Sequence, residues 1–574
     1  MILKALYDYY QRSQDQLPLF GMELKEIAFL IVIDREGNFV RFEDRRIDKK
    51  QAQQFLVKKH IGRTSALAAN YLYDNSGYVF GYSDKGNAQP QFETFKTKIE
   101  EIYGAHPNNE DIKAVHQFYQ NDIASLHARM QEDPLWDDIT KNLNKKFSTF
   151  SFLIEGDTTI VASKKDLITD NMEESSGSDI CLISGKHGTS VETTTATMIA
   201  GSQATAKLVS FQVSSGYDSY GKSKGFNAPI SAESEFAYTT ALNHLLESKS
   251  RNKFLIGTRT FVFWASKKDD AGQAAESSLF SMFSFQENES NPNSNIESVR
   301  KVFESIYKGQ IRTAVEDKFF ILGLAPNSAR IAVVYWAEIP LKEFAGTICR
   351  HFDDMTIIDT RKEPKPYMSL RNLLSAVTLG GKSSEATPNL PDALVKSIFQ
   401  GLPYPQTLFA SCIRRIRAES GDKDRNPISI SRAAILKAYL NRLNNNHKKI
   451  QPMLDYNNEN QGYLCGRLFA VLEKIQEEAN NQHTIRERYM NSASTTPAAV
   501  FSTILNLSNH HSEKLNSEGR KIFFEKLKQE IMSKIDADGF RPQLDLQDQG
   551  RFFIGYYHQR QSFFDKKEEN NNEQ

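Results

Sequence analysis

Cysteine is scarce in this chain of 574 residues, and its four cysteines lie far apart: Cys181, Cys349, Cys412 and Cys465. The spacing excludes the paired CxxC ligands of a zinc motif. So few cysteines in so long a chain also argue against a disulfide framework. This usage favours a reducing compartment, and we expect a cytoplasmic protein.

The chain also lacks a net charge, because 71 basic residues balance 71 acidic ones. A globally basic nucleic-acid coat is therefore excluded, and any contact with nucleic acid must come from local patches. No run of about 18 apolar residues is present, so the sequence predicts no transmembrane helix. The N-terminus is too short and too polar to be a signal peptide.

Recognisable catalytic motifs are missing as well. Gly381-Lys382-Ser383 resembles the end of a phosphate-binding loop, but Ala376 stands where that motif needs a glycine. Asp353 and Asp354 form a carboxylate pair, yet adjacent residues of a helix or strand usually diverge. We therefore predict a non-enzymatic binding subunit with no catalytic residues, metal or cofactor. The alternative is a metal-dependent nuclease whose carboxylates gather from distant segments.

Apolar patterning predicts the secondary structure of the first two thirds of the chain. We expect hairpins over residues 27–44, 147–162 and 319–340, and an apolar strand over Thr260–Trp264. We expect helices over 3–13 and Ser65–Tyr73, a strand over Tyr78–Tyr82 and a solvated helical pair within 92–132. The polar stretch 275–300 reads as an inserted loop, and we assign it no role.

After Pro366 the pattern becomes helical, with helices expected over 429–446, 461–482, 496–510 and 515–536. Pro497 suits a first helical turn. The fold class is therefore α+β: a mixed α/β N-terminal body with antiparallel hairpins, followed by an all-α C-terminal helical bundle. We expect domains over 1–365, 366–452 and 453–574.

The stretch from Lys207 to Leu246 reads as a strand, a glycine-rich loop and a helix. Glycine lets backbone approach a ligand closely, lysine neutralises phosphate, and aromatic rings stack on bases. The loop combines all three, which indicates contact with nucleic acid. Its candidate residues are Tyr217, Tyr220, Lys222, Lys224 and Asn227. An ordinary glycine-rich connection ahead of a helix stays open as the alternative.

A second candidate block spans residues 58–75. Lys58, Lys59 and Arg63 would contact phosphates, which fix the position of a duplex. The side-chain amides of Asn70 and Asn75 would read base edges. A further basic run contains Arg414, Arg415 and Arg417, then Arg432, Lys437, Arg442, Lys448 and Lys449. For both stretches, a solvated surface is the alternative.

Five blocks along the chain resemble the large subunit of the type I-C CRISPR Cascade effector, the Csd-one (Cas eight-c) family. They are MILKALYDYYQR with LPLFGMELKEIAFLIVIDREGNF; RTSALAANYLYDNSGYVFG; CLISGKHG with VSFQVSSGYDSYGKSKGFNAPISAESEFAYTTALNHLL; FFILGLAPNSARIAVVYW; and GYLCGRLFAVLEKIQEEAN. These blocks follow the family's order and span most of the chain.

The resemblance implies a subunit of a crRNA-guided complex that recognises the protospacer-adjacent motif in double-stranded DNA. Such a subunit promotes unwinding and R-loop formation, holds the non-target strand and helps recruit a separate helicase-nuclease. Its partners would be crRNA, target DNA, the repeat-backbone subunit, the crRNA 5′-end subunit and small helical subunits. The resemblance also implies an internal translation start, for which Met453 is our candidate, that yields the C-terminal bundle as a small subunit.

Overall fold

The computed structural model describes residues 1–564 apart from a set of short segments. Those segments are 50, 62–66, 84–87, 144–146, 169–176, 212–217, 219, 284–291, 362–368, 423–425 and 444–448. The chain divides into two compact units. The N-terminal unit comprises Leu3–Thr195 and Ser210–His244, and the C-terminal unit comprises Ala196–Val209 and the chain from Leu245 onward.

A four-stranded sheet forms the centre of the N-terminal unit, in the order β3-β2-β6-β5. Its strands are β2 (Phe29–Ile33), β3 (Phe39–Asp44), β5 (Tyr73–Asn75) and β6 (Thr149–Ile154). The predicted hairpin over 27–44 is confirmed as β2 and β3. The predicted hairpin over 147–162 is wrong beyond its first strand. β6 pairs with β2 on one side and β5 on the other, so no edge is left for a returning strand.

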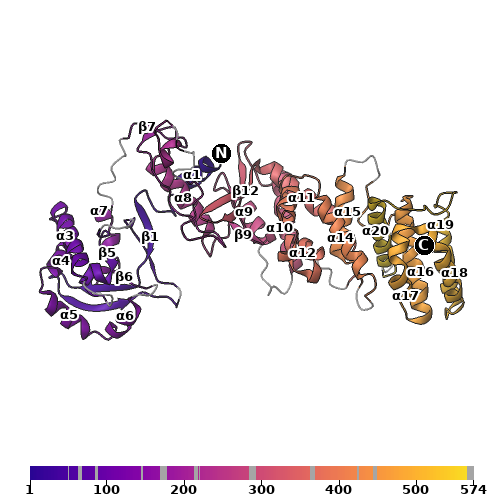
Figure 1. The fold of residues 1–574 in the computed structure, drawn as a ribbon, viewed down its shortest axis with the longest axis horizontal. Helices are drawn as coiled ribbons and strands as arrows, with labels where there is room; N and C mark the ends of the chain where they lie inside the picture. Colours follow the sequence, from indigo (N-terminus) through magenta and orange to yellow (C-terminus); the bar gives the residue numbers. More distant parts are fainter. Residues whose placement is uncertain are drawn as a thin grey trace, which may run out of the picture. The chain divides into compact units, whose positions relative to one another are not determined.

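Helices cover the aromatic face of this sheet (Figure 1). They are α2 (Ser76–Phe80), α3 (Gln89–Ala105), α4 (Glu110–Phe118), α5 (Ile123–Gln131) and α6 (Trp136–Asn142). Phe118 lies 5.3 Å from Phe152 of β6, and Trp136 lies 6.3 Å from Phe42 of β3, measured between ring centroids. The prediction of a solvated helical pair within 92–132 is therefore wrong, because these helices bury apolar side chains against the sheet.

The stretch 65–82 also differs from the prediction. Residues 67–72 are not helical, Tyr73–Asn75 is strand β5, and Tyr78 lies inside helix α2. The oxygen of the Asn75 side chain accepts hydrogen bonds from the N–H groups of Gly77 and Tyr78, which caps the helix. Gly81 then ends it with a φ of 68°. This capping outweighs the turn and strand preferences of the local sequence.

Several short elements complete the N-terminal unit. β1 (Met22–Glu26) and β4 (Gln54–Lys58) form an antiparallel ribbon, and β7 (Asp179–Ile180) and β8 (His187–Gly188) form a small hairpin. α1 (Ile2–Arg12) confirms the predicted first helix, and α8 (Ala232–Leu246) confirms the helix of the 207–246 stretch. Instead of the expected strand before that helix, Lys207 makes an isolated bridge to Arg330. The remaining elements are η1 (Val161–Ser163), α7 (Lys165–Ile168) and η2 (Lys224–Asn227).

An antiparallel sheet begins the C-terminal unit, in the order β12-β11-β10-β9. Its strands are β9 (Lys253–Ile256), β10 (Arg259–Ala265), β11 (Lys318–Asn327) and β12 (Arg330–Pro340). The predicted hairpin over 319–340 and the strand over Thr260–Trp264 are confirmed. Helices α9 (Asp270–Phe283), α10 (Pro292–Tyr307) and α11 (Leu341–Met355) cover one face.

The predicted loop over 275–300 is wrong in its described part, because α9 and α10 occupy both of its ends. The stretch is polar overall, but Ala275, Leu279 and Met282 recur at helical spacing and are buried. Val299 of α10 is buried in the same core. A few apolar residues on one face were enough to bury each helix against the sheet.

The rest of the C-terminal unit is helical (Figure 1). Its elements are α12 (Leu370–Ala376), η3 (Leu379–Gly381), η4 (Ser383–Glu385), α13 (Leu390–Phe399), α14 (Gln406–Glu419), α15 (Ile430–Arg442), α16 (Gln461–Asn480), α17 (Thr484–Thr495), α18 (Pro497–Glu513), α19 (Glu518–Met532) and α20 (Leu546–Ser562). The four predicted helices are confirmed as α15, α16, α18 and α19, with Pro497 in the first turn of α18. Helices α17 and α20 were not predicted from the sequence.

One apolar core runs from β9 through α11 and α15 to α20. The described residues between 245 and 361 therefore belong to the same compact unit as the C-terminal helices, although the sequence grouped them with the N-terminal body. The α+β fold class is confirmed, with sheets in the N-terminal part and helices alone at the C-terminal end. The domain bounds 1–365, 366–452 and 453–574 stay a prediction about parts that fold independently.

Candidate nucleic-acid interface

Glu23 of β1 anchors the start of the 58–75 block. The backbone N–H of His60 donates to Glu23 Oε1 at 3.1 Å, and His60 Nδ1 lies 2.8 Å from Glu23 Oε2. The hydroxyl of Tyr73 donates to the same carboxylate at 2.9 Å. Burial by itself raises the pKa of Glu23, but the hydrogen bonds from His60 and Tyr73 outweigh it and lower the pKa. An ionised carboxylate thus holds the end of β4 against β5.

Asn70 stabilises the backbone that follows His60. Its Oδ1 accepts a hydrogen bond from the N–H of Ile61 at 2.9 Å, and its own N–H donates to Asp74 Oδ2 at 3.0 Å. The side chain is buried, with 9% exposed. The Asn70 oxygen therefore holds the backbone of Ile61 next to Asn70. Contact of Asn70 with a base edge stays a prediction, and Arg63 lies outside the described residues.

The side chain of Asn75 also stabilises the backbone, because its oxygen caps α2. The N–H groups of Gly77 and Tyr78 donate to it at 3.0 and 3.4 Å. Only the amide nitrogen of Asn75 is left for a base edge. The role proposed for this side chain in reading DNA also stays a prediction.

The two lysines of the block stand over aromatic rings. Lys58 Nζ lies 3.9 Å from the ring centroid of Tyr71, and Lys59 Nζ lies 5.5 Å from that of Phe236 in α8. Lys59 Nζ also lies 3.4 Å from Thr195 Oγ1. Within the described part of the chain, Lys59 meets no carboxylate, so its charge is available to an anion. The contacts of Lys59 bring the start of the 58–75 block close to Thr195 and to helix α8.

Part of the central loop is folded onto itself. The amide of Asn227 donates to the backbone oxygens of Lys222 and Lys224 at 3.0 and 3.1 Å. Lys224 Nζ forms an ion pair with Glu192 Oε1 at 2.6 Å. Asp218 accepts a hydrogen bond from the N–H of Lys224 at 3.1 Å. Asn227 and Lys224 therefore shape the loop, and their predicted contact with DNA stays a prediction.

Among the candidate residues of this loop that the structure describes, Tyr220 and Lys222 are the exposed ones. Tyr220 is completely exposed and adopts a φ of 51°, which places it at a tight turn. Lys222 is exposed, with no carboxylate partner in the described ranges. Tyr217 lies outside those ranges. An exposed ring beside an unpaired lysine is the pairing that stacks on a base and neutralises its phosphate.

The neighbouring β7–β8 hairpin carries exposed apolar residues that were not predicted from the sequence. Ile180 and Leu182 are each 59% exposed, and Lys186 at the turn is also exposed. The N–H of Leu182 donates to the carbonyl of Pro229 at 3.0 Å, which attaches the hairpin to the central loop. The alternation of Ile180, buried Cys181 and Leu182 before a Ser-Gly turn was the signal for it. We call Ile180, Leu182, Lys186, Tyr220, Lys222 and Phe226 the finger surface.

Cys181 at the base of this hairpin is buried, and its Sγ accepts a hydrogen bond from the N–H of Ile183 at 3.4 Å. Burial raises the pKa of the thiol, but hydrogen bonds from Ser234 and Ser184 outweigh it and lower the pKa to about 6. The buried Cys181 side chain thus lies between the hairpin and the start of α8.

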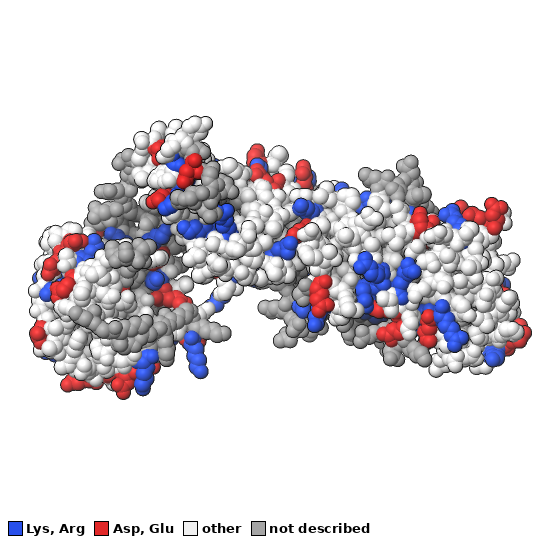
Figure 2. Space-filling model, viewed as in Figure 1, with Lys and Arg blue, Asp and Glu red and all other residues white. Residues whose placement is uncertain are grey.

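Basic and acidic side chains are interspersed over the visible face of the molecule (Figure 2).

Most of the second basic run forms ion pairs and hydrogen bonds within the fold. Arg415 and Arg432 pair with Glu419, and Arg442 pairs with Asp354 at 2.5 Å. The buried Lys437 donates to the backbone oxygen of Asp353. Arg414 and Arg417 are exposed on α14, and Lys449 is also exposed. Lys448 lies outside the described residues.

The Asp353–Asp354 pair diverges as expected for neighbours on a helix. Asp353 pairs with Arg300 of α10 at 2.7 Å, whereas Asp354 pairs with Arg442 of α15. The described residues contain no group of three or more His, Cys, Asp or Glu side chains placed to hold a metal ion. In the same residues, no helix is long and apolar enough to cross a membrane.

Comparison with protein-family models finds one that covers nearly the whole chain. It is described as "CRISPR-associated protein (Cas_Csd1)" and matches residues 6–564. A comparison with curated proteins finds no match. The family match spans both compact units, including the finger surface and the bundle around α16. The chain therefore belongs to the CRISPR-associated Csd-one family, the family of type I-C Cascade large subunits that the five sequence blocks indicated.

Proposed function

We propose that this chain is the non-catalytic large subunit of a type I-C CRISPR Cascade complex and acts in the cytoplasm. In this proposal it recognises the protospacer-adjacent motif in double-stranded DNA, promotes unwinding and R-loop formation, and holds the non-target strand. It works with crRNA and the other Cascade subunits and helps recruit a helicase-nuclease. Family membership supports the CRISPR part of this proposal.

The finger surface is the observation that carries the DNA-binding part. Monomeric proteins rarely leave apolar side chains grouped in solvent unless they contact something. Here Ile180, Leu182 and Tyr220 are more than half exposed on two segments that hydrogen bond to each other. Lys186 and Lys222 stand on the same segments without carboxylate partners in the described chain. The finger surface therefore combines apolar side chains that can separate bases, an aromatic ring that can stack on a base, and lysines that can contact phosphates.

Each member of the set has a physical use in opening a duplex. Apolar side chains inserted between base steps unstack them, at a cost of a few kcal/mol per step. An aromatic ring such as Tyr220 returns about 1–3 kcal/mol by stacking on an exposed base. Guide pairing reads most of the target, so the protein needs only a short motif and a grip on the backbone.

The test measures strand opening by the assembled complex with its crRNA. A duplex target carries 2-aminopurine beside the motif, and its fluorescence rises when the base unstacks. We expect the triple variant Ile180→Ser, Leu182→Ser, Tyr220→Ala to lower the opening rate about tenfold or more, since stacking alone is worth about 1–3 kcal/mol. Leu24→Ser, at a half-exposed position on β1, is the matched control and leaves the rate unchanged.

If the triple variant opens the duplex as fast as the unaltered complex, the finger surface has no part in unwinding.

The non-catalytic assignment has its own test. The purified chain is incubated with DNA and Mg²⁺ or Mn²⁺, and we expect no cleavage. Metal-dependent cleavage that disappears in Asp353→Ala would contradict the assignment and favour a nuclease.

A further inference from the structure

Helix α14 divides its three arginines into two sets. Arg415 is largely buried and pairs with Glu419. Arg414 and Arg417 lie one turn apart on the same side of the helix, and both are exposed. Within the part of the chain that the structure describes, neither of them forms an ion pair. The outer side of α14 therefore presents two guanidinium groups that no carboxylate of the described chain neutralises.

Helix α17 adds a third arginine to this surface. The side-chain amide of Asn491 donates to the backbone oxygen of Arg417 at 3.2 Å, which joins α17 to α14. The guanidinium of Arg486 donates to the backbone oxygen of Asp422, just after α14, at 2.9 Å. Arg488 lies one turn before Asn491 and is exposed, and it forms no ion pair with another described residue. We call Arg414, Arg417 and Arg488 the arginine patch.

The surroundings of the arginine patch favour a nucleic acid over a protein as its ligand. The core of a protein–protein interface is apolar and depends on large buried side chains. Among the described residues of α14 and α17, no large hydrophobic side chain is exposed. Interfaces with nucleic acid are polar and positively charged, and a guanidinium binds phosphate through two parallel hydrogen bonds.

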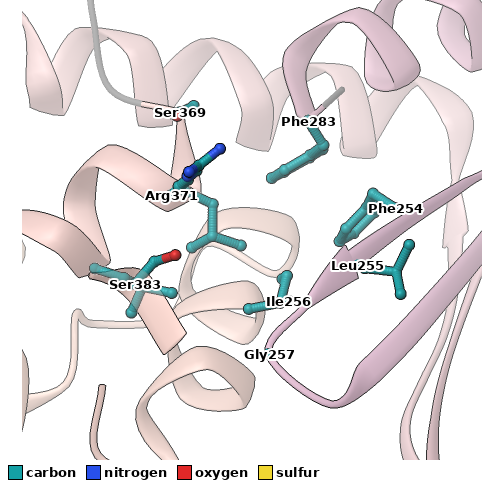
Figure 3. Close-up of a pocket in the computed structure, with 10 residues that line it drawn as sticks. Phe254, Leu255, Ile256, Gly257, Phe283, Ser369, Arg371 and Ser383 are labelled. Atoms are coloured by element: carbon teal, nitrogen blue, oxygen red, sulfur yellow. The ribbon is translucent and has the colours of Figure 1, made fainter. Parts of the chain in front are cut away.

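The cavity between β9 and α12 offers a contrast in the same unit (Figure 3). Its volume is about 180 Å³, whereas pockets for cofactors and drug-sized ligands measure about 300–1,000 Å³. Ser369, Arg371 and Ser383 line it beside the rings of Phe254 and Phe283. One exposed arginine does not define a ligand, so we assign none to the cavity and use Arg371 as a control position.

We propose that the arginine patch is a second nucleic-acid contact of this chain and binds the phosphates of a single strand. The inference rests on the proposed function, which supplies two strands of this chemistry, the crRNA and the displaced DNA strand. The patch differs from the finger surface because it has no exposed apolar or aromatic side chain in its described surroundings. It therefore holds a strand by its backbone, without separating bases or reading their sequence.

The first test measures the binding of fluorescein-labelled strands of 12 dT or 12 rU nucleotides to the purified full chain by fluorescence anisotropy. The triple variant Arg414→Gln, Arg417→Gln, Arg488→Gln removes three charges and keeps good helix-forming residues. Three phosphate contacts with a single strand contribute about 2 to the slope of log K against log salt concentration. We expect the slope to fall by about 2 and the affinity at about 50 mM salt to fall about tenfold or more.

The control makes the same charge change elsewhere in the C-terminal unit. It is the triple variant Arg350→Gln, Arg371→Gln, Lys382→Gln, at three exposed positions. We expect the affinity and the salt dependence of this variant to match those of the unaltered chain.

A second measurement, on the assembled complex, separates the two sources of the strand. If crRNA occupies the arginine patch, the variant complex retains less crRNA after a wash at high salt. If the displaced DNA strand occupies it, the crRNA content is unchanged and the salt slope for binding of target DNA falls by about 2. Either result supports the inference.

An unchanged salt slope for both labelled strands would overturn the inference, and so would a variant complex that shows neither effect. Loss of other Cascade subunits from the variant complex, with strand binding unchanged, would assign the arginine patch to a protein partner instead. The outcome for the finger surface is separate. If its triple variant opens the duplex at the unaltered rate while the arginine patch variant loses strand binding, the proposed unwinding role fails and this inference stands.

Discussion

At the scale of single residues, several polar side chains of the candidate interface stabilise the fold through hydrogen bonds. Their residue types alone do not indicate this role. The oxygens of Asn70 and Asn75 accept backbone hydrogen bonds, and Asn227 holds its own loop together. Tyr220 and Lys222 have no such duty among the described contacts of their side chains. The structure therefore leaves fewer candidate side chains with groups available to DNA than the composition of the loop indicated.

Asn75 allows the structural and the base-reading role to be separated. Ser is as good a helix cap as Asn, but it lacks the amide nitrogen. We expect Asn75→Ala to lower the free energy of unfolding by about 1 kcal/mol, whereas Asn75→Ser keeps it. If the amide reads the motif, both variants lose discrimination between duplexes with and without the motif, as measured by competitive binding. Discrimination that survives in Asn75→Ser would assign the side chain to capping alone.

His558 of α20 predicts how stability depends on pH. Burial lowers the pKa of His558 from its ordinary 6.5 to about 3, and the charge of Lys437 adds to this. The folded state then binds the proton more weakly than the unfolded chain. The contribution of neutral His558 to the free energy of unfolding is fully present above about pH 6.5 and is lost as pH falls towards 3.

We expect His558→Gln to remove about 2 kcal/mol of the stability difference between pH 7 and pH 5, measured by urea unfolding. Gln also keeps a polar group near the hydroxyl of Tyr463, which lies 3.0 Å from His558 Nδ1. His510→Gln, at an exposed position of α18, is the control and keeps the full pH dependence. An unchanged pH dependence in His558→Gln would mean that this histidine is not buried in its neutral form.

At the scale of elements, α16 and α20 pack closely against each other. Gly462 and Gly466 of α16 and Gly555 of α20 let the two helices touch backbone to backbone. α20 packs on α14 and α15 as well, through contacts such as Gly550 against Phe409. A product begun at Met453 would keep α16 to α20 but leave this second face of α20 uncovered. Separate production of the bundle stays a proposal.

Gly466 tests this packing. A Cβ at Gly466 would overlap the carbonyl oxygen of Phe552, so Gly466→Ala must push the helices apart. We expect a loss of about 3 kcal/mol in the free energy of unfolding, at the upper end of overpacking costs. Gly519→Ala, where a Cβ meets only Ser517 Oγ at 3.6 Å, is the matched control and is neutral or slightly stabilising. Equal stability of the two variants would show that α16 and α20 are not in close contact.

At the scale of the whole molecule, the balance of 71 basic and 71 acidic residues means that attraction to DNA is local. Each lysine that contacts a phosphate releases about one counterion on binding. We therefore expect Lys59→Gln and Lys222→Gln each to reduce the slope of log K against log salt concentration by about 1. Lys382→Gln, at a lysine whose side chain is 73% exposed in the C-terminal unit, serves as the control. Slopes identical to that of the unaltered complex would remove both lysines from the interface.

Sequence alone determined the α+β class, the hairpins over 27–44 and 319–340, four of the C-terminal helices and the family. These features depend on local periodicity, turn residues and ordered motifs, which can be recognised in the sequence before the fold is known. Tertiary structure decided that β6 pairs on both edges, that α9 and α10 occupy the two ends of the polar stretch 275–300, and that α20 is buried between α15 and α16. It also decided that the Asn70 oxygen holds the backbone of Ile61 while Ile180 and Leu182 stay exposed. The physical reason is that burial and hydrogen-bond partners are set by distant segments, which no local pattern records.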